Sequence, residues 1–472
     1  MFQMSSPVPF DRSKGSGQTM GSVEGKAGLE PLSKARFPQL KEDKKGFYLV
    51  LAYLLFEFGR PQEMLPGLKL IPFGTGLSVL IFLTAIMSGK LSFSRMQTRL
   101  WIPLFVIMAI HVPTAANNYK ALMMFKDMLL LYGVYLGIVA FVDSLDKMRV
   151  LINVWVGILC FLAVMGVAKG GHGVGAWMGD ENDFCMVMDM AVPFGYFLLF
   201  SVTGVAQKVK YLGFLGSFLL AAMASLSRGG FFGLAAVGAY CWYRSPKKLN
   251  ALIVVVVAVV FMLVLAPATY WDEIASSTSD ETVGEHGTGG ARLYTWGIGM
   301  EMFLYNPIIG VGQSNFPWAF ERYEAGRRFH DRSMAGREAH NAWVTLVAEL
   351  GLAGIIIIGG MLFQCYRDLK WIRARFTPAK SSQKHGQIVQ AGEDIRMYIA
   401  RAMEGSLIGF IVSGVFISTL WYPALWIMIA FVVALRNISE TQSEGALPSA
   451  VQKKHPWGVP LPRLGERPVS RL

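Results

Sequence analysis

The sequence has few cysteines and lacks the motifs that bind soluble nucleotides. Its 472 residues include 4 cysteines, which lie in or beside apolar segments without CxxC spacing, so neither a disulfide framework nor a metal site is expected. A GxxxxGK[ST] loop is absent, and no GxGxxG motif follows a strand-like segment. These absences argue against a nucleotide-dependent site.

Acidic residues are in the minority, with 32 Asp and Glu against 44 Lys and Arg and a net charge of +12. Such a balance can indicate nucleic-acid binding, but the basic residues lie between apolar runs without interleaved aromatic residues. They occur at every second connection: KLSFSRMQTR, DSLDKMR, AQKVK, RSPKK and YRDLKWIRARFTPAKSSQK. By the positive-inside rule, these connections and both termini face the cytoplasm, and no nucleic-acid partner is expected.

Long apolar runs dominate the sequence. Hydrophobic residues make up 53% of the chain, with 31 Phe and 25 Met, which is too apolar for a soluble globular protein. The fold class is predicted to be an all-α polytopic membrane protein with about 12 transmembrane helices. The candidate spans are 46–58, 69–88, 100–116, 121–142, 149–167, 184–203, 211–226, 231–243, 250–269, 342–364, 402–418 and 420–436.

The spans divide the chain into five parts. Residues 1–44 are polar, Gly/Ser-rich and charged, as in a disordered cytoplasmic tail. They contain no pattern typical of a cleaved signal, so the first span is expected to be a retained anchor. Residues 45–269 hold transmembrane helices 1–9, residues 270–340 form an outward-facing loop, residues 341–436 hold helices 10–12, and residues 437–472 form a second cytoplasmic tail.

The outward loop is far longer than an ordinary connection between helices, which indicates a functional role. Its first part is acidic, and its later part is basic from Arg322 to Arg337. The stretch ARLYTWGIGMEMFLYNP has apolar residues at helical spacing and ends at Pro307, and FPWAFERYEAG is a second amphipathic stretch. The loop is therefore predicted to be a small helical cap over the outer face of the bundle.

Three arginines lie at this predicted outer face. Arg60 follows the first span in FEFGRPQ, and Arg228 lies in a tight turn in SLSRGGFFG. An anion-binding role and a contact with lipid headgroups are both open for these two. Arg292 lies at the start of the amphipathic stretch, where a cation is unfavourable for the helix dipole, so a bound anion explains it better.

A histidine and an asparagine precede an apolar run in GREAHNAWVTLVAELGLAG, residues 336–354. A neutral His340 can accept a proton near neutral pH, and Asn341 can hold a sugar hydroxyl or a phosphate oxygen. Arg337 lies three residues earlier, and its charge would help to keep the imidazole neutral. The alternative is that His340 is an ordinary polar residue at a helix end.

A carboxylate cluster lies at the outward start of another span, in WMGDENDFCMVM, residues 177–188. Asp180 is expected to cap that helix. Asn182 and Asp183 are candidate sugar contacts. Asp189, about two turns further on, could face a cavity.

These segments resemble the O-antigen ligase family of bacterial membrane glycosyltransferases. The resemblance is carried by ARLYTWGIGMEMFLYNPIIGVGQSNF followed by HNAWVTLVAELGLAG, and FEFGRPQ and GDENDF are also similar. It covers roughly residues 46 to 436 and is most specific over 291–354. The O-antigen polymerases share the pattern more loosely.

The resemblance implies a GT-C-like enzyme that transfers a glycan from undecaprenyl pyrophosphate to an acceptor at the periplasmic face of the bacterial inner membrane. The transfer would be inverting and would need no metal or other cofactor. The acceptor would be the lipid A core, or another lipid, a protein or a growing polysaccharide. Catalytic roles are implied for His340, Arg228 and Arg292.

The candidate substrate contacts are Arg60, Asn182, Asp183, Arg337 and Asn341. One alternative function is a polymerase that joins lipid-linked repeat units. Another is a transporter or flippase, for which intramembrane charges near the midplane and broken helices are expected.

Overall fold

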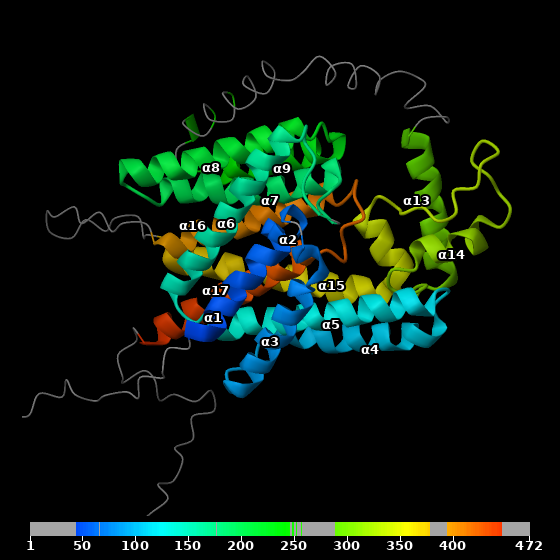
Figure 1. Ribbon diagram of the computed structural model, residues 1–472, viewed down its shortest axis with the longest axis horizontal. Coiled ribbons are helices and arrows are strands. Elements are labelled where there is room, and N and C mark those ends of the chain that lie inside the picture. The colour runs from blue at the N-terminus through cyan, green and yellow to red at the C-terminus, as the bar shows by residue number, and fades with distance from the viewer. Residues whose placement is uncertain are drawn as a thin grey trace, which may run out of the picture. The chain divides into compact units, whose positions relative to one another are not determined.

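The computed structural model describes residues 44–245 apart from 66 and 176, positions 248, 249, 252 and 256, residues 288–377 and residues 394–445. Within these ranges the secondary structure is helical, without a strand (Figure 1). Several predictions lie outside the described residues: the N-terminal tail, most of the span 250–269, the acidic start of the loop, and the C-terminal tail beyond residue 445.

All predicted spans except 250–269 coincide with helices. These are α1 (Lys44–Leu54) with the π-helical η2 (Leu55–Gly59), α3 (Phe73–Met87), α4 (Met96–Thr114), α5 (Asn118–Phe141), α6 (Leu145–Ala168), α7 (Glu181–Phe200), α8 (Val205–Ala224), α9 (Arg228–Arg244), α15 (Ala342–Phe376), α16 (Ile395–Ser413) and α17 (Pro423–Gly445). Two short elements, α2 (Pro61–Met64) and η3 (Leu68–Leu70), connect η2 to α3.

Six of these helices, α4, α5, α6, α7, α15 and α17, are long and apolar enough to cross a membrane. The chain is thus a helical, multi-pass membrane protein, while the full set of about 12 spans remains a prediction. The four cysteines are unpaired, as expected.

Helix α7 is the most completely buried of the six candidate spans and packs against α8, α9 and α16. Asp189 lies in this contact, fully buried, and accepts a hydrogen bond from Ser413 Oγ at 2.8 Å. A Cβ at Gly233 of α9 would lie only 2.4 Å from the Asp189 carboxylate. Asp189 therefore lies at a tight helix contact and does not line any of the cavities described below.

The described part of the segment 270–340 contains α13 (Thr288–Tyr305) and α14 (Phe316–Glu324), at the two stretches where the sequence predicts helices. Their amphipathic character and outward orientation remain predictions. They enclose a small apolar core of their own, which includes Ile298, Met302 and Phe320. Figure 1 shows the pair beside the start of α15 and the ends of α4 and α5, and the Asn117 backbone N–H donates to Asn315 Oδ1 at 2.7 Å across this contact. A GT-C-like cap over the bundle remains a prediction.

Helix α15 is interrupted at Gly351, where φ is 60° and ψ is −155°. The interruption frees backbone groups on both sides, and the segment 307–312 pairs with them. The bonds run from the N–H of Val311 to Ala348, of Gly312 to Glu349, of Leu352 to Pro307 and of Ala353 to Ile308, at 2.8 to 3.0 Å. Unpaired backbone groups are costly in apolar surroundings, so the break and the loop segment depend on each other.

A broken helix is one of the features expected of a transporter. In this chain, the freed backbone groups bond to the protein's own loop. The break therefore has a structural explanation that needs no bound ion or transported solute.

Replacing Gly351 with alanine is expected to destabilise the protein. A positive φ is unfavourable for a residue with a Cβ, and the new Cβ would lie 2.7 Å from the Ile308 backbone. The strain alone should cost about 1–3 kcal/mol, visible as a lower melting temperature of the detergent-purified protein. Gly359→Ala is the matched control, because no atom lies within 4 Å of a Cβ there. Equal melting temperatures for the two variants would contradict this account.

Candidate active site

His340 lies just before α15 and has a left-handed backbone conformation, with φ at 47°. Its neighbours are fixed on both sides. The Ala339 carbonyl accepts a hydrogen bond from Trp296 Nε1 at 2.8 Å, and the Ala342 N–H donates to the Gly414 carbonyl at 2.7 Å. A non-glycine residue keeps such a conformation only where its surroundings enforce it. The backbone position of His340 is therefore set jointly by α13, α15 and the turn that follows α16.

Asn341 caps α15. Its Oδ1 accepts hydrogen bonds from the backbone N–H groups of Trp343 at 2.9 Å and Val344 at 3.0 Å. The side chain thereby satisfies two of the free donors at the start of the helix. A substrate contact through Asn341 would have to use its Nδ2, because the oxygen is engaged.

Arg292 lies within electrostatic reach of His340, and Arg228 lies within reach of Arg292. Arg292 lies on α13 one turn before Trp296, so the same helix face carries both residues. Partial burial and then the charge of Arg292 lower the pKa of His340. Burial and then the charge of Arg228 lower the pKa of Arg292 itself. Arg292 is thus coupled electrostatically both to His340 and to Arg228, although the three residues are far apart in sequence. Neither arginine lines the cavity described next.

The start of α7 positions Arg228, which begins α9. Ser227 caps α9 by accepting a hydrogen bond from the Gly230 N–H at 3.0 Å, and its hydroxyl donates to Asn182 Oδ1 at 2.7 Å. The Asn182 N–H in turn donates to Asp180 Oδ1 at 2.8 Å, which confirms the capping role expected for Asp180. Asn182 therefore joins the starts of α7 and α9.

A cavity of about 290 Å³ lies between these elements and is called here the first cavity. Its charged and amide-bearing lining residues are Asp180, Asn182, Asp183, Glu338, His340 and Glu349. Carboxylates accept hydrogen bonds from hydroxyl groups, so this wall suits a sugar. Among the described residues, no group of three or more His, Cys, Asp or Glu side chains is arranged to hold a metal ion.

Asp183 has an oxygen available for a ligand. The residue is only 7% exposed, and its Oδ2 accepts a hydrogen bond from the Tyr422 hydroxyl at 3.2 Å. Its Oδ1 is buried without a hydrogen-bond partner. Because buried polar atoms are rarely left unsatisfied, a ligand hydroxyl is a natural partner for this oxygen.

Glu349 also lines the first cavity and was not a candidate in the sequence. Its carboxylate is 1% exposed and accepts hydrogen bonds from the N–H groups of Ser314 at 2.8 Å and Phe316 at 2.9 Å, and from Trp421 Nε1 at 2.7 Å. The available signal was a carboxylate inside a predicted span, which is costly unless it is paired. Glu349 fastens the GVGQSNF segment to the cavity wall.

Arg60 does not line the first cavity. Its Nη2 lies 3.6 Å from Glu57 Oε1, and its guanidinium lies over the Trp177 ring, 5.9 Å from the centroid. The Trp177 indole also donates to Glu57 Oε1 at 2.9 Å. The charge of Arg60 is thus matched by a neighbouring carboxylate, and a direct role in substrate binding stays a proposal.

Arg337 is exposed and does not line the first cavity. Its charge lowers the pKa of His340, which is the expected direction, although burial and Arg292 contribute more. The negative charge of Asp180 raises the pKa of His340. The net effect keeps the imidazole uncharged at neutral pH.

Comparison with known proteins locates the similarity in the same region. Residues 213–359 match the family model described as O-Antigen ligase. Over these residues the chain is similar to the O-antigen ligases. The matched segment contains Arg228, Arg292, His340 and the break at Gly351, so the family resemblance inferred from the sequence is confirmed.

A curated relative adds a second similarity. The chain is 33% identical over 86 residues to the exopolysaccharide production protein ExoQ of Rhizobium meliloti (strain 1021). The alignment covers 18% of this chain and 20% of the relative, so it spans about a fifth of that protein.

Replacing Arg337 with glutamine is expected to raise the pKa of His340 toward its ordinary value, because a positive charge that disfavours the imidazolium is removed. Diethylpyrocarbonate modifies neutral imidazole, so the rate of His340 modification against pH, followed by mass spectrometry, reports this pKa. The half-maximal rate should move to higher pH. Arg332→Gln, an exposed change in the same loop, is the control. An unchanged or lower pKa in Arg337→Gln would show that this charge does not act on the imidazole.

Proposed function

We propose that the protein is a membrane glycosyltransferase of the ligase type. It transfers a glycan from undecaprenyl pyrophosphate to an acceptor such as the lipid A core, at the periplasmic face of the bacterial inner membrane. The observation that carries this proposal is that His340 lines a polar cavity and lies within electrostatic reach of Arg292, which in turn lies within reach of Arg228. All three residues belong to the segment that matches the O-antigen ligases.

In the proposed reaction, an acceptor hydroxyl attacks the anomeric carbon of the donor sugar. The bond from this carbon to the pyrophosphate oxygen breaks, and its electron pair remains on the pyrophosphate. Arginine guanidinium groups offer fixed, two-pronged donors to such an anion, so Arg228 and Arg292 would stabilise the leaving group. One in-line displacement inverts the anomeric centre.

The proton of the attacking hydroxyl passes to His340. The lowered pKa keeps this imidazole neutral near pH 7, so it has a free lone pair when the acceptor binds. The carboxylates of the first cavity, Asp183 with its unpartnered oxygen among them, would hold sugar hydroxyls in place.

The proposed orientation places both termini in the cytoplasm and the first cavity in the periplasm, with the domain division described above. An ion cluster at the opposite ends of α9 and α15 supports it. Glu404 of α16 accepts from Arg244 at 3.2 Å and pairs with Arg373 at 3.0 Å, whereas Arg228 and His340 mark the other ends of the same two helices. Retained basic residues at helix ends are typical of the cytoplasmic side.

A polymerase is the second candidate function, because the ExoQ relative is described as an exopolysaccharide production protein. A polymerase joins repeat units while both partners remain on lipid carriers. The same histidine and arginines would serve this reaction, since its leaving group and nucleophile are of the same chemical kinds.

Replacing His340 with alanine is expected to reduce glycan transfer at least about 100-fold, the usual contribution of a general base. The test is glycan display in cells that lack the chromosomal gene and carry wild type, His340→Ala or Arg332→Ala. Lipid-linked glycan and the amount of inserted protein are quantified alongside. Arg332 is exposed and does not line the first cavity, so Arg332→Ala should behave as wild type.

The species that accumulates distinguishes the two candidate functions. Full-length glycan on its carrier in the His340→Ala cells indicates ligation, and single lipid-linked units indicate polymerisation. Normal display with correctly inserted His340→Ala protein would exclude His340 as the base.

A further inference from the structure

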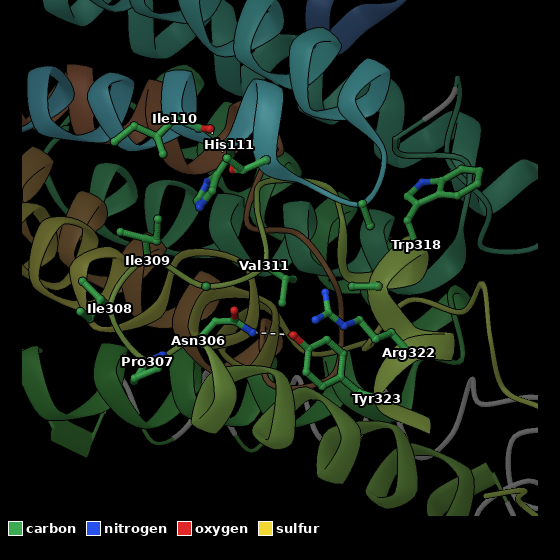
Figure 2. Close-up of a pocket in the computed structure, with 14 residues that line it drawn as sticks. Ile110, His111, Asn306, Pro307, Ile308, Ile309, Val311, Trp318, Arg322 and Tyr323 are labelled. Atoms are coloured by element: carbon green, nitrogen blue, oxygen red, sulfur yellow. Dashed lines mark hydrogen bonds between the residues drawn. The ribbon is translucent and has the colours of Figure 1, made fainter. Parts of the chain in front are cut away.

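A second cavity, of about 440 Å³, lies between the end of α4 and the corner that joins α13 to α14 (Figure 2). Its lining includes Ile110, His111, Asn306, Trp318, Arg322 and Tyr323. The segment 310–314 separates the two cavities, since Gly310 and Val311 line the second and Ser314 lines the first. Among these lining residues, Arg322 was singled out in the sequence, as the start of the basic part of the loop.

The hydrogen-bonding state of His111 follows from its partner Gln313. The Gln313 Nε2 donates to the carbonyls of Met108 and Ala121, both at 3.0 Å. Its Oε1 must therefore be the acceptor in the 2.9 Å contact with His111 Nδ1. Nδ1 carries the hydrogen, and the other ring nitrogen of the neutral imidazole is a bare acceptor.

That bare acceptor has no partner within the protein. His111 is only 2% exposed, and its Nε2 is buried without a hydrogen bond. Figure 2 shows the imidazole projecting into the cavity. A hydroxyl donor from a ligand would satisfy this otherwise costly arrangement.

The opposite wall supplies a cation and aromatic surface. Figure 2 shows the Arg322 guanidinium directed toward the cavity from α14. Among the described residues, no carboxylate pairs with Arg322, whereas the nearby Arg327 forms a two-pronged ion pair with Glu301 at 2.7 and 2.5 Å. Trp318 is 53% exposed, and Tyr323 is held by the Asn306 side-chain amide at 2.5 Å. Rigid aromatic side chains beside a few polar groups are typical of ligand pockets.

We infer that the second cavity binds a sugar residue that carries an acidic substituent. Its hydroxyl donates to His111 Nε2, its carboxylate or phosphate contacts Arg322, and its ring lies near Trp318 and Tyr323. The inference rests on the proposed function, because the bound sugar is taken to belong to the glycan donor or to the acceptor. A glycan bound in the second cavity would contact the segment 310–314, and Ser314 at the end of that segment lines the first cavity.

The test is equilibrium dialysis of the detergent-purified full chain with labelled tetragalacturonate, an acidic probe, and with maltotetraose, a neutral one. The acidic probe should bind at least about tenfold more tightly than the neutral one, because a charge-assisted hydrogen bond contributes on that scale. Arg322→Ala should weaken binding of the acidic probe about tenfold or more. Arg332→Ala, an exposed arginine of the same loop that lines neither cavity, should leave it unchanged.

His340→Ala separates this inference from the proposed function. This variant should bind the acidic probe like wild type, whether or not it transfers glycan. Loss of binding in His340→Ala with full binding in Arg322→Ala would place the probe in the first cavity and overturn the inference. Equal affinity for the acidic and neutral probes would also overturn it.

A transfer assay identifies which substrate supplies the sugar. A higher KM for the lipid-linked donor in Arg322→Ala assigns the acidic residue to the glycan being transferred, and a higher KM for the acceptor assigns it to the acceptor. Unchanged KM values for both substrates would overturn the inference.

Discussion

The exchange of backbone hydrogen bonds between the break in α15 and the segment 307–312 is the contact on which the rest of the site depends. A helix interrupted in apolar surroundings leaves donors and acceptors that must be paired. The loop segment supplies them, and in doing so it is fixed against the bundle. Glu349, two residues before the break, extends this attachment by accepting from Ser314 and Phe316. The break in α15 thus holds the loop segment in place, and this segment separates the two cavities.

The first cavity is surrounded by helix beginnings. Helices α7, α9 and α15 are capped by Asp180, Ser227 and Asn341, and each starts at or beside this cavity. Helix N-termini carry partial positive charge, which adds to that of Arg228 and Arg292. The same wall also holds carboxylates, Asp183 and Glu338 among them. Positive groups for a phosphate and acceptors for sugar hydroxyls therefore lie within one region, as the proposed lipid-linked donor requires.

His340 owes its properties to its position between fixed neighbours. Trp296 of α13 holds the preceding carbonyl, and the end of α16 holds the N–H of Ala342. Burial lowers the pKa of His340 most, and the charge of Arg292 lowers it further. Helix α13 carries Arg292 as well as Trp296, so the contact that fixes the backbone beside His340 also brings this charge. Geometry and acidity at this residue are consequences of one packing arrangement.

The sequence by itself determined the features that depend on a few neighbouring residues. Long apolar runs predicted where most of the helices lie, and amphipathic spacing predicted the positions of α13 and α14. Asp180 could be recognised as a helix cap because capping involves only the first turn of the helix that follows. Only the tertiary structure decided the contacts between distant segments. No local sequence pattern predicts the hydrogen bonds between these distant residues, which join Glu349 to Ser314, Asn182 to Ser227 and His111 to Gln313. Such pairs exist because particular helices pack side by side, and the periodicity of each helix specifies its buried face without specifying which helix will cover it.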